Sequence, residues 1–222
     1  MNFKELNFHP NLMEGIESIN YKNATPRQEQ VIPHILEGKD VIACAQTGTV
    51  KTAAFLLPII HKIISSPHDE SNINALIIVP TRELAIQISQ NLEGLSYFTS
   101  VSSIAVYGGG DGHSFTIEKK ALSSGAELII ATPGRLISHL KKGYVKLKAL
   151  KYLILDEADR MLDMGFQDDI LKIINHLPTQ RQTLLFSATM PGKIRELARK
   201  ILQNPVEVNV AISKPAGKIV QR

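Results

Sequence analysis

Two adjacent acids, Asp156 and Glu157, follow directly on the apolar run 152–155. Such a run predicts a buried strand, which delivers both carboxylates to the end of that strand. Mg²⁺ is commonly held by one or two carboxylates together with phosphate and water, and a second carboxylate can orient or deprotonate an attacking water. We therefore predict Asp156 as a Mg²⁺ ligand and Glu157 as a catalytic base. An acidic helix N-terminus is the alternative, but it does not explain a carboxylate pair placed directly after a strand.

A segment suited to phosphate lies upstream, between a predicted strand and a predicted helix. Residues 45–52 read Ala-Gln-Thr-Gly-Thr-Val-Lys-Thr. In a phosphate loop the backbone N–H groups converge on the anion, and the following helix adds its positive end. Lys51 would reach the β- and γ-phosphates of a nucleotide and assist catalysis, and Thr52 would place its hydroxyl on Mg²⁺. The expected nucleotide contacts in this segment are Gln46, Thr47, Gly48, Thr49, Val50, Lys51 and Thr52. An ordinary strand-to-helix turn is the alternative, which the acids at 156 and 157 disfavour.

Val50 is the main departure in this segment, which fails the strict G-x-x-x-x-G-K-[ST] pattern at both glycine positions. A β-branched residue resists positive φ, so it is expected to strain the loop or to shift the amides that should point at the anion. Strain of this kind costs about 1–3 kcal/mol. Because the other expected site residues are intact, we interpret Val50 as a local variant that weakens nucleotide binding.

Composition limits the classes of protein that fit. The 222 residues suit one α/β domain, and 25 Lys and Arg against 21 Asp and Glu give a net charge of +4, compatible with nucleic acid but no proof of it. The single cysteine, Cys44, excludes an internal disulfide and is expected to be a buried structural thiol. No signal peptide or bilayer-spanning run is evident, so we expect a soluble, cytoplasmic protein. The histidines lack zinc spacing, and the basic stretch 141–151 is expected to be a solvated face.

Apolar, β-rich runs alternate with helical patterns along the chain, which predicts an α/β fold with a mainly parallel sheet and helices on both faces. The expected strands are 40–45, 75–79, 102–106, 127–131, 151–155, 183–187 and 206–210. The helical patterns include 52–64, 82–95, 135–141, 168–177 and 193–202. Parallel sheets bind ligands at the carboxyl ends of their strands, and nearly every motif falls just after one of these runs. Residues 65–72 are expected to form a polar surface loop, and 211–222 a linker or tail.

Taken in order, these motifs resemble the first RecA-like domain of a DEAD-box RNA helicase, and among those the bacterial RhlE-like group. The resemblance covers about residues 3–210 and implies a RecA-like P-loop NTPase domain over 1–210. Residues 156–159 read Asp-Glu-Ala-Asp, and 80–84, 108–109, 132–135 and 187–189 complete the series of motifs. The implied cofactors are ATP and Mg²⁺.

Residues 6–34 resemble the adenine-reading Q motif of that family. Gln28 can donate and accept hydrogen bonds at once, which matches the paired donor and acceptor of adenine. Tyr21 is expected to stack on the base and Thr25 to join the same site, whereas core filling is the favoured role for Phe8. Arg27 stands where the family often carries an apolar residue.

The resemblance also implies contacts with the backbone of one RNA strand. The residues it assigns to RNA are Pro80, Thr81, Arg82, Gly109, Thr132, Pro133, Gly134 and Arg135. They lie in loops where exposed N–H groups and hydroxyls can hold phosphates irrespective of base, and 2′-hydroxyls would distinguish RNA from DNA. Without the resemblance, 132–134 would be a turn and helix cap and 108–112 a flexible loop.

Ser187 and Thr189 are expected to couple hydrolysis to domain motion, through hydroxyls that would bond the carboxylates of 156–159, including Asp159. A helix cap is the modest alternative. The resemblance further implies a second RecA-like domain, joined through the linker 211–222, so the chain is interpreted as a monomeric fragment of an ATP-dependent RNA helicase that is inactive by itself. A binding module for RNA or protein, with a nucleotide site impaired by Val50, is the second hypothesis.

Overall fold

The computed structural model describes residues 1–44, 49–66, 72–110 and 112–209. A seven-stranded sheet runs through it in the order β3-β4-β2-β5-β6-β1-β7, and every pairing is parallel. The strands are β1 (Val41–Cys44), β2 (Ala75–Ile78), β3 (Ser103–Val106), β4 (Leu128–Ala131), β5 (Tyr152–Leu155), β6 (Gln182–Ser187) and β7 (Val206–Asn209). The predicted α/β class and all seven predicted strands are confirmed.

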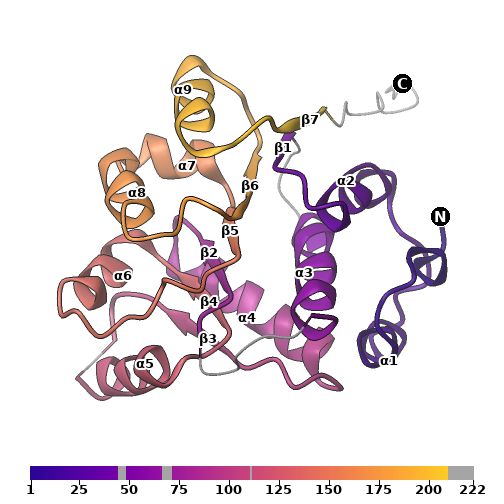
Figure 1. Ribbon diagram of the computed structural model, residues 1–222, viewed down its shortest axis with the longest axis horizontal. Coiled ribbons are helices and arrows are strands. Elements are labelled where there is room, and N and C mark those ends of the chain that lie inside the picture. Colours follow the sequence, from indigo (N-terminus) through magenta and orange to yellow (C-terminus); the bar gives the residue numbers. More distant parts are fainter. Residues whose placement is uncertain (45–48, 67–71, 111, 210–222) are drawn as a thin grey trace, which may run out of the picture.

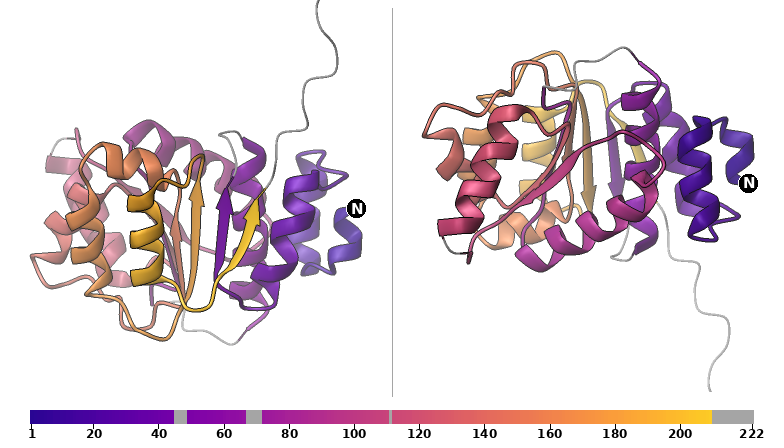
Figure 2. Two further views of the ribbon diagram at one scale, coloured as in Figure 1. Left: turned by 90° about the horizontal axis from the view of Figure 1, so that it is seen from above. Right: turned by 90° about the horizontal axis from the view of Figure 1, so that it is seen from below.

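Helices cover both faces of the sheet, as expected (Figures 1 and 2). They are η1 (Phe3–Leu6), α1 (Pro10–Ser18), α2 (Pro26–Leu36), α3 (Thr49–Ile64), α4 (Arg82–Ser96), α5 (Gly112–Ser124), α6 (Pro133–Leu140), α7 (Ala158–Asp163), α8 (Gln167–Ile174) and α9 (Gly192–Ile201). The five helical patterns named from the sequence correspond to α3, α4, α6, α8 and α9. α6 begins earlier than expected because Pro133 occupies its first turn, and α8 ends at Ile174 rather than at Leu177.

Successive strand residues enter different halves of the core. In β2, Ala75 and Ile77 pack into the apolar cluster formed with α1 to α4, whereas Leu76 and Ile78 pack into the cluster on the opposite face with α5 to α9. All four are fully buried. Side chains alternate across a strand, so a sheet covered on both faces needs apolar residues at every position. This explains why its strands were recognisable as continuous apolar runs.

The N-terminal segment wraps around the outside of α2 and α3 (Figure 1). Asn2 forms an antiparallel bridge with Asn23, and the amide of Ala24 donates to the carbonyl of Met1. Leu12 and Ile16 of α1 are fully buried in the core cluster. The start of the chain is thereby tied to the segment that leads into α2.

The strand order divides the carboxyl edge of the sheet into two halves. β5, β6 and β1 are consecutive in this order, and they end at Leu155, Ser187 and Cys44 in one half. β3, β4 and β2 are the other neighbours, and they deliver the loops around Gly108, Thr132 and Pro80 to the other half. The two halves meet where β2 pairs with β5. Among the helices described, none is both long and apolar enough to cross a membrane.

Candidate nucleotide and RNA sites

A buried ion pair joins the first turn of α3 to the end of β5. Lys51 Nζ lies 2.8 Å from Asp156 Oδ1, with side-chain exposures of 5% and 3%. Lys51 Nζ makes no well-directed hydrogen bond to any described residue, so the contact is a charge pair whose N–H donors remain to be satisfied. A buried ammonium without directed acceptors is costly, and an anion at this position would relieve that cost. Thr52 is also buried in the same turn.

The rest of the expected phosphate segment is only partly described. Gln46, Thr47 and Gly48 lie outside the described residues. Thr49 and Val50 begin α3, and helical backbone has negative φ, which valine adopts without strain. The strained loop, one of the two effects expected of Val50, is therefore not seen, because the backbone is helical there. The other effect, displaced amides, stays a prediction.

Glu157 has left-handed backbone, with φ 52° and ψ 48°. This conformation is uncommon for a residue with a Cβ and is found disproportionately at functional sites. Its amide donates to Asp156 Oδ1 at 2.9 Å, and its Oε2 lies 3.2 Å from Arg160 Nη1. Glu157 is the N-cap residue of α7, yet its side chain makes no cap hydrogen bond to the described backbone. Helix capping therefore does not account for the carboxylate.

Asp159 is held by the segment that follows β6. Asp159 Oδ2 accepts from both the amide and the hydroxyl of Thr189 at 2.9 Å, and the amide of Asp159 donates to Ser187 Oγ at 3.2 Å. Burial alone would raise the pKa of Asp159, but hydrogen bonds from Thr189 and neighbouring groups outweigh it and lower the pKa below its usual value. The expected contact with a carboxylate of 156–159 is thus present for the Thr189 hydroxyl, whereas the Ser187 hydroxyl donates to the carbonyl of Thr189.

Cys44 is less buried than expected. It ends β1 at the carboxyl edge, is partly exposed, and its Sγ lies 3.6 Å from the carbonyl oxygen of Ala188. The apolar run predicted full burial, but the run ends at this residue. The thiol therefore borders the same half of the edge as Asp156 rather than lying within the core.

The start of α2 is organised by Thr25 and Gln28. Gln28 Oε1 accepts from the amide of Thr25 at 2.8 Å, and the amide of Gln28 donates to Thr25 Oγ1 at 3.4 Å. This reciprocal arrangement is a capping box, and Gln28 is almost completely buried. The glutamine amide therefore has a structural partner in addition to its predicted role in reading adenine.

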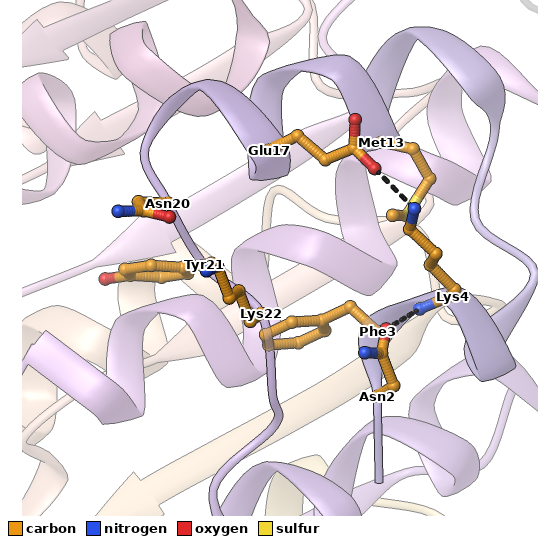
Figure 3. A pocket seen from close by; sticks show the side chains of 8 residues that line it. All are labelled: Asn2, Phe3, Lys4, Met13, Glu17, Asn20, Tyr21 and Lys22. Atoms are coloured by element: carbon orange, nitrogen blue, oxygen red, sulfur yellow. Dashed lines mark hydrogen bonds and ion pairs between the residues drawn. The ribbon is translucent and has the colours of Figure 1, made fainter.

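Tyr21 lies in a separate hollow at the N-terminal segment. It lines a cavity of about 320 Å³ together with Phe3, and Figure 3 shows the side chains around this cavity. The two rings are nearly parallel, 16° apart in plane and 6.4 Å between centroids, and Tyr21 is 37% exposed. Lys4 and Glu17 form an ion pair of 3.0 Å at the same hollow. Gln28 is not among the described residues that line it, so the two predicted adenine contacts do not share this cavity.

Phe8 fills the core, as favoured from the sequence. It is buried in the cluster with α1 to α4, and its ring meets His61 edge-on at 5.6 Å. The five lysines between 141 and 151 are exposed, as expected of a solvated face. They are Lys141, Lys142, Lys146, Lys148 and Lys151.

The residues assigned to RNA gather on the other half of the edge. A shallow groove of about 460 Å³ is lined by residues that include Pro80, Arg82, Thr132, Gly134 and Arg135. The groove thus collects residues assigned to RNA from two separate segments, one after β2 and one after β4. Of the remaining residues assigned to RNA, Thr81 caps α4 through the amide of Leu84, and Pro133 is buried in the first turn of α6.

Two details of the groove bear on its role. Arg82 Nη1 reaches the carbonyl oxygen of Gly109 at 3.4 Å, and Gly109 has a φ of +86° that a side chain would oppose. Thr132 is the N-cap of α6, but its hydroxyl makes no cap hydrogen bond to the described residues. The turn and helix cap considered as the alternative for 132–134 are thus present in the backbone, with Pro133 in the first turn, but the Thr132 hydroxyl does not serve as a cap for the described residues.

One buried cluster beneath the groove was not anticipated. Glu118 of α5 contacts both Arg135 and His139 of α6. Neither Glu118 nor His139 stands out in the sequence, because a single acid and a single histidine in helical segments carry no recognisable spacing. They are identified only by the contact between their side chains in the folded chain.

Comparison with known proteins agrees with this arrangement. Residues 25–197 match the DEAD/DEAH box helicase family model. The chain belongs to the DEAD/DEAH box helicase family. It is 43% identical over 220 residues to the ATP-dependent RNA helicase CshA of Listeria monocytogenes, covering 99% of this chain and 41% of that protein. It is 46% identical over 224 residues to the DEAD-box ATP-dependent RNA helicase CshA of Streptococcus pneumoniae, covering 100% and 41%.

A third relative is the DEAD-box ATP-dependent RNA helicase RhpA of Helicobacter pylori, 44% identical over 211 residues, which are 95% of this chain and 42% of that protein. The chain thus spans about two fifths of the length of these curated relatives. None of these three names identifies the RhlE-like group, so that subgroup stays a prediction.

Proposed function

We propose that this helicase-family domain is the N-terminal half of an ATP-dependent RNA helicase, which binds ATP with Mg²⁺ and the backbone of single-stranded RNA. The buried pair of Lys51 and Asp156 carries the proposal. A lysine from a helix start and a carboxylate from a strand end are the two charges that a phosphate and its metal require. In the absence of a ligand, the charges of Lys51 and Asp156 neutralise each other at the position where phosphate and Mg²⁺ would bind.

The residues present fit that cofactor pair. Lys51 would bind the β- and γ-phosphates, while Thr52 and Asp156 would hold Mg²⁺, which supplies charge stabilisation at the transferred phosphate. Glu157 would orient or deprotonate the attacking water. Its carboxylate makes no cap hydrogen bond to the described backbone of α7, which supports a role other than helix capping.

RNA would occupy the other half of the carboxyl edge. The groove around Pro80, Thr132 and Arg135 offers hydroxyls, amides and a guanidinium that recognise a sugar-phosphate backbone and ignore base identity. Because β2 and β5 are paired, the loop after β2 and the acids after β5 leave the sheet side by side. A shift of the loop after β2 would therefore displace the acids after β5.

Coupling of hydrolysis to duplex remodelling would need a second RecA-like domain. The longer length of the relatives supports this proposal. We propose residues 1–210 as domain 1 and 211–222 as the connection to domain 2, in a cytoplasmic monomer. The contact of Asp159 with Thr189 would link the acids after β5 to the segment that follows β6.

A binding module for RNA or protein with an impaired nucleotide site is the second candidate, and Val50 is the feature that favours it. Titration calorimetry with ATP and Mg²⁺ on residues 1–222 separates the two, with Lys51→Ala as the control that lacks the phosphate-binding charge. Saturable binding that is lost in Lys51→Ala supports the helicase half. Binding that is absent even in Val50→Gly supports the module.

Catalysis is tested in a protein that carries the second domain and Val50→Gly. Glu157→Gln should abolish ATP hydrolysis and leave ATP binding nearly intact, because the change removes a base but keeps the shape. Residues 1–222 alone should separate no RNA duplex. Unimpaired turnover in Glu157→Gln would remove that residue from its assigned role.

A further inference from the structure

A buried polar cluster ties α5 to α6 beneath the RNA groove. Glu118 Oε2 lies 2.7 Å from Arg135 Nε and 2.7 Å from His139 Nε2, and His139 is completely buried. Tyr144 Oη hydrogen-bonds His139 Nδ1 on the other side of the ring. Burial lowers the pKa of His139 more than its bond to Glu118 raises it. A neutral imidazole then donates to Glu118 and accepts from Tyr144, so one carboxylate holds both an arginine and a fixed histidine.

Phe115 packs against the same groups. Its ring stacks on His139 with centroids 4.2 Å apart and an interplanar angle of 15°, and the guanidinium carbon of Arg135 lies 4.6 Å from its centroid. The Arg135 side chain is therefore fixed by a charge-assisted hydrogen bond at Nε and by contact with an aromatic face. A planar guanidinium held in this way has one orientation rather than many.

One donor of Arg135 is left over. Arg135 Nη2 is buried and makes no hydrogen bond to any residue in the described part of the chain. Arg135 also lines the groove with Thr132 and Gly134. Arg135 Nη2 is shielded from solvent, so a phosphate in the groove would contact the part of the Arg135 side chain that remains exposed, 15% of its surface. Holding the guanidinium in place beforehand lowers the ordering cost of that contact.

We propose that Glu118 is a positioning residue for RNA: it holds Arg135 in the orientation that contacts the phosphate backbone, and its negative charge is secondary to this hydrogen bond. The inference rests on the proposed function, since it takes the groove to be the RNA site. It concerns a residue of α5, outside the loops that the family resemblance assigns to RNA.

Two roles of Glu118 give opposite results on substitution. If Glu118 only lowered the positive potential of the groove, both Glu118→Gln and Glu118→Ala would tighten RNA binding. If it positions Arg135, Glu118→Gln retains an acceptor for Arg135 Nε and stays within about twofold of the unaltered affinity. Glu118→Ala then loses about threefold to tenfold, a part of what one charge-assisted hydrogen bond contributes.

The measurement is fluorescence anisotropy of a labelled single-stranded oligouridylate with residues 1–222 at several salt concentrations. Arg135→Ala should weaken binding by about tenfold and reduce the salt slope by about one. Glu118→Ala should reduce the slope in the same way, which a purely structural role would not do. The double variant should bind no more weakly than Arg135→Ala alone.

Glu93→Ala is the matched control, because it removes an exposed carboxylate of α4 with the same change of net charge.

Glu118→Asp provides a second variant that keeps the charge but shortens the reach, and it should also weaken binding. If thermal melting shows that Glu118→Ala does not fold, the RNA affinity of Glu118→Asp tests the positioning role instead. Tighter binding in Glu118→Ala, an unchanged affinity in Glu118→Asp, or additive losses in the double variant would overturn the positioning role while Arg135→Ala still supports the RNA site. No saturable binding by the unaltered chain, or no effect of Arg135→Ala, would overturn both.

Discussion

Lys51 Nζ and Asp156 Oδ1 are 2.8 Å apart in a nearly solvent-free position, although one residue lies in the first turn of α3 and the other follows β5. The pair exists because β1 and β5 both end at the same half of the carboxyl edge, with β6 between them. Removing one partner of a buried pair leaves a charge without compensation. Their proximity is thus both a stability element and the proposed phosphate and metal site.

The first prediction follows from that pair. Lys51→Met and Asp156→Leu should each lower the free energy of unfolding, by up to about 3–5 kcal/mol. The double variant should recover most of the loss, because two apolar side chains can replace a buried ion pair without penalty. Urea denaturation of the three variants measures this. Additive losses in the double variant would show that the two charges do not compensate each other.

The sequence was sufficient for the strands because a parallel sheet buried on both faces needs uninterrupted apolar runs, such as Leu76 to Ile78 in β2. The first residues of the helices were harder to predict than the strands. Thr25 and Gln28 have the spacing of a capping box, a signal that was available and that places Gln28 in the local structure as well as in the predicted adenine site. Strand order was not readable, since it depends on contacts between elements far apart in sequence.

Other parts of the site could not have been predicted from residue types. Glutamate rarely adopts left-handed backbone, so nothing in the sequence indicated the conformation of Glu157. The strain expected at Val50 is not seen for a related reason: the pattern identified a place usually occupied by glycine, but not the helical backbone there. Glu118 and His139 come together only through the packing of α5 on α6.

The second prediction tests the left-handed backbone of Glu157. Glu157→Gly and Glu157→Ala both remove the carboxylate and its contact with Arg160, but only glycine adopts this φ without a Cβ penalty of about 1–2 kcal/mol. Glycine also gains freedom in the unfolded chain, so the net advantage of Glu157→Gly over Glu157→Ala should be about 1 kcal/mol. Denaturant unfolding of the two variants decides it, and an alanine variant of equal or greater stability would contradict the conformation.

The third prediction concerns pH and the contact between Asp159 and Thr189. The folded pKa of Asp159 is lowered, so its contribution to stability is present above the ordinary aspartate pKa near 3.9 and is lost as pH falls through the folded pKa. Thr189→Val removes one hydrogen bond to this carboxylate and should cost about 1 kcal/mol at pH 7, a modest value because the site is partly exposed. The difference from the unaltered chain should shrink below about pH 4.

A control separates this effect from the general loss of a hydroxyl. Thr116 donates to the carbonyl of Gly112 on the exposed side of α5, where no carboxylate accepts its bond. The cost of Thr116→Val should therefore be the same at pH 7 and at pH 3. If Thr189→Val is equally independent of pH in thermal melts, the hydroxyl does not act through Asp159.

The fourth prediction distinguishes the two roles of Gln28. Gln28→Glu keeps an acceptor for the amide of Thr25 and so preserves the capping box, but it loses the N–H donor that adenine readout needs. The new carboxylate is buried, so the free energy of unfolding should fall even though the capping box is kept, and the preference for ATP over GTP should fall by about 1–3 kcal/mol. Competition binding in a Val50→Gly background measures this preference. Equal ATP and GTP binding before the change would show that Gln28 does not read the base.

The last prediction is for Val50, in the first turn of α3 directly before Lys51. Helical backbone removes the argument from φ, and what remains is that two γ-methyl groups at this turn restrict how closely a phosphate can approach the backbone amides. Val50→Ala removes those methyl groups and retains a Cβ and good helix propensity. Val50→Gly removes more volume but should lower the free energy of unfolding by about 0.5–1 kcal/mol, because glycine is unfavourable in a helix. Both variants should bind ATP with Mg²⁺ about tenfold more tightly than the unaltered chain in titration calorimetry, which is about 1.4 kcal/mol. Recovery with glycine alone would mean that the helical turn must rearrange on binding, and no recovery with either variant would show that valine does not impair the site.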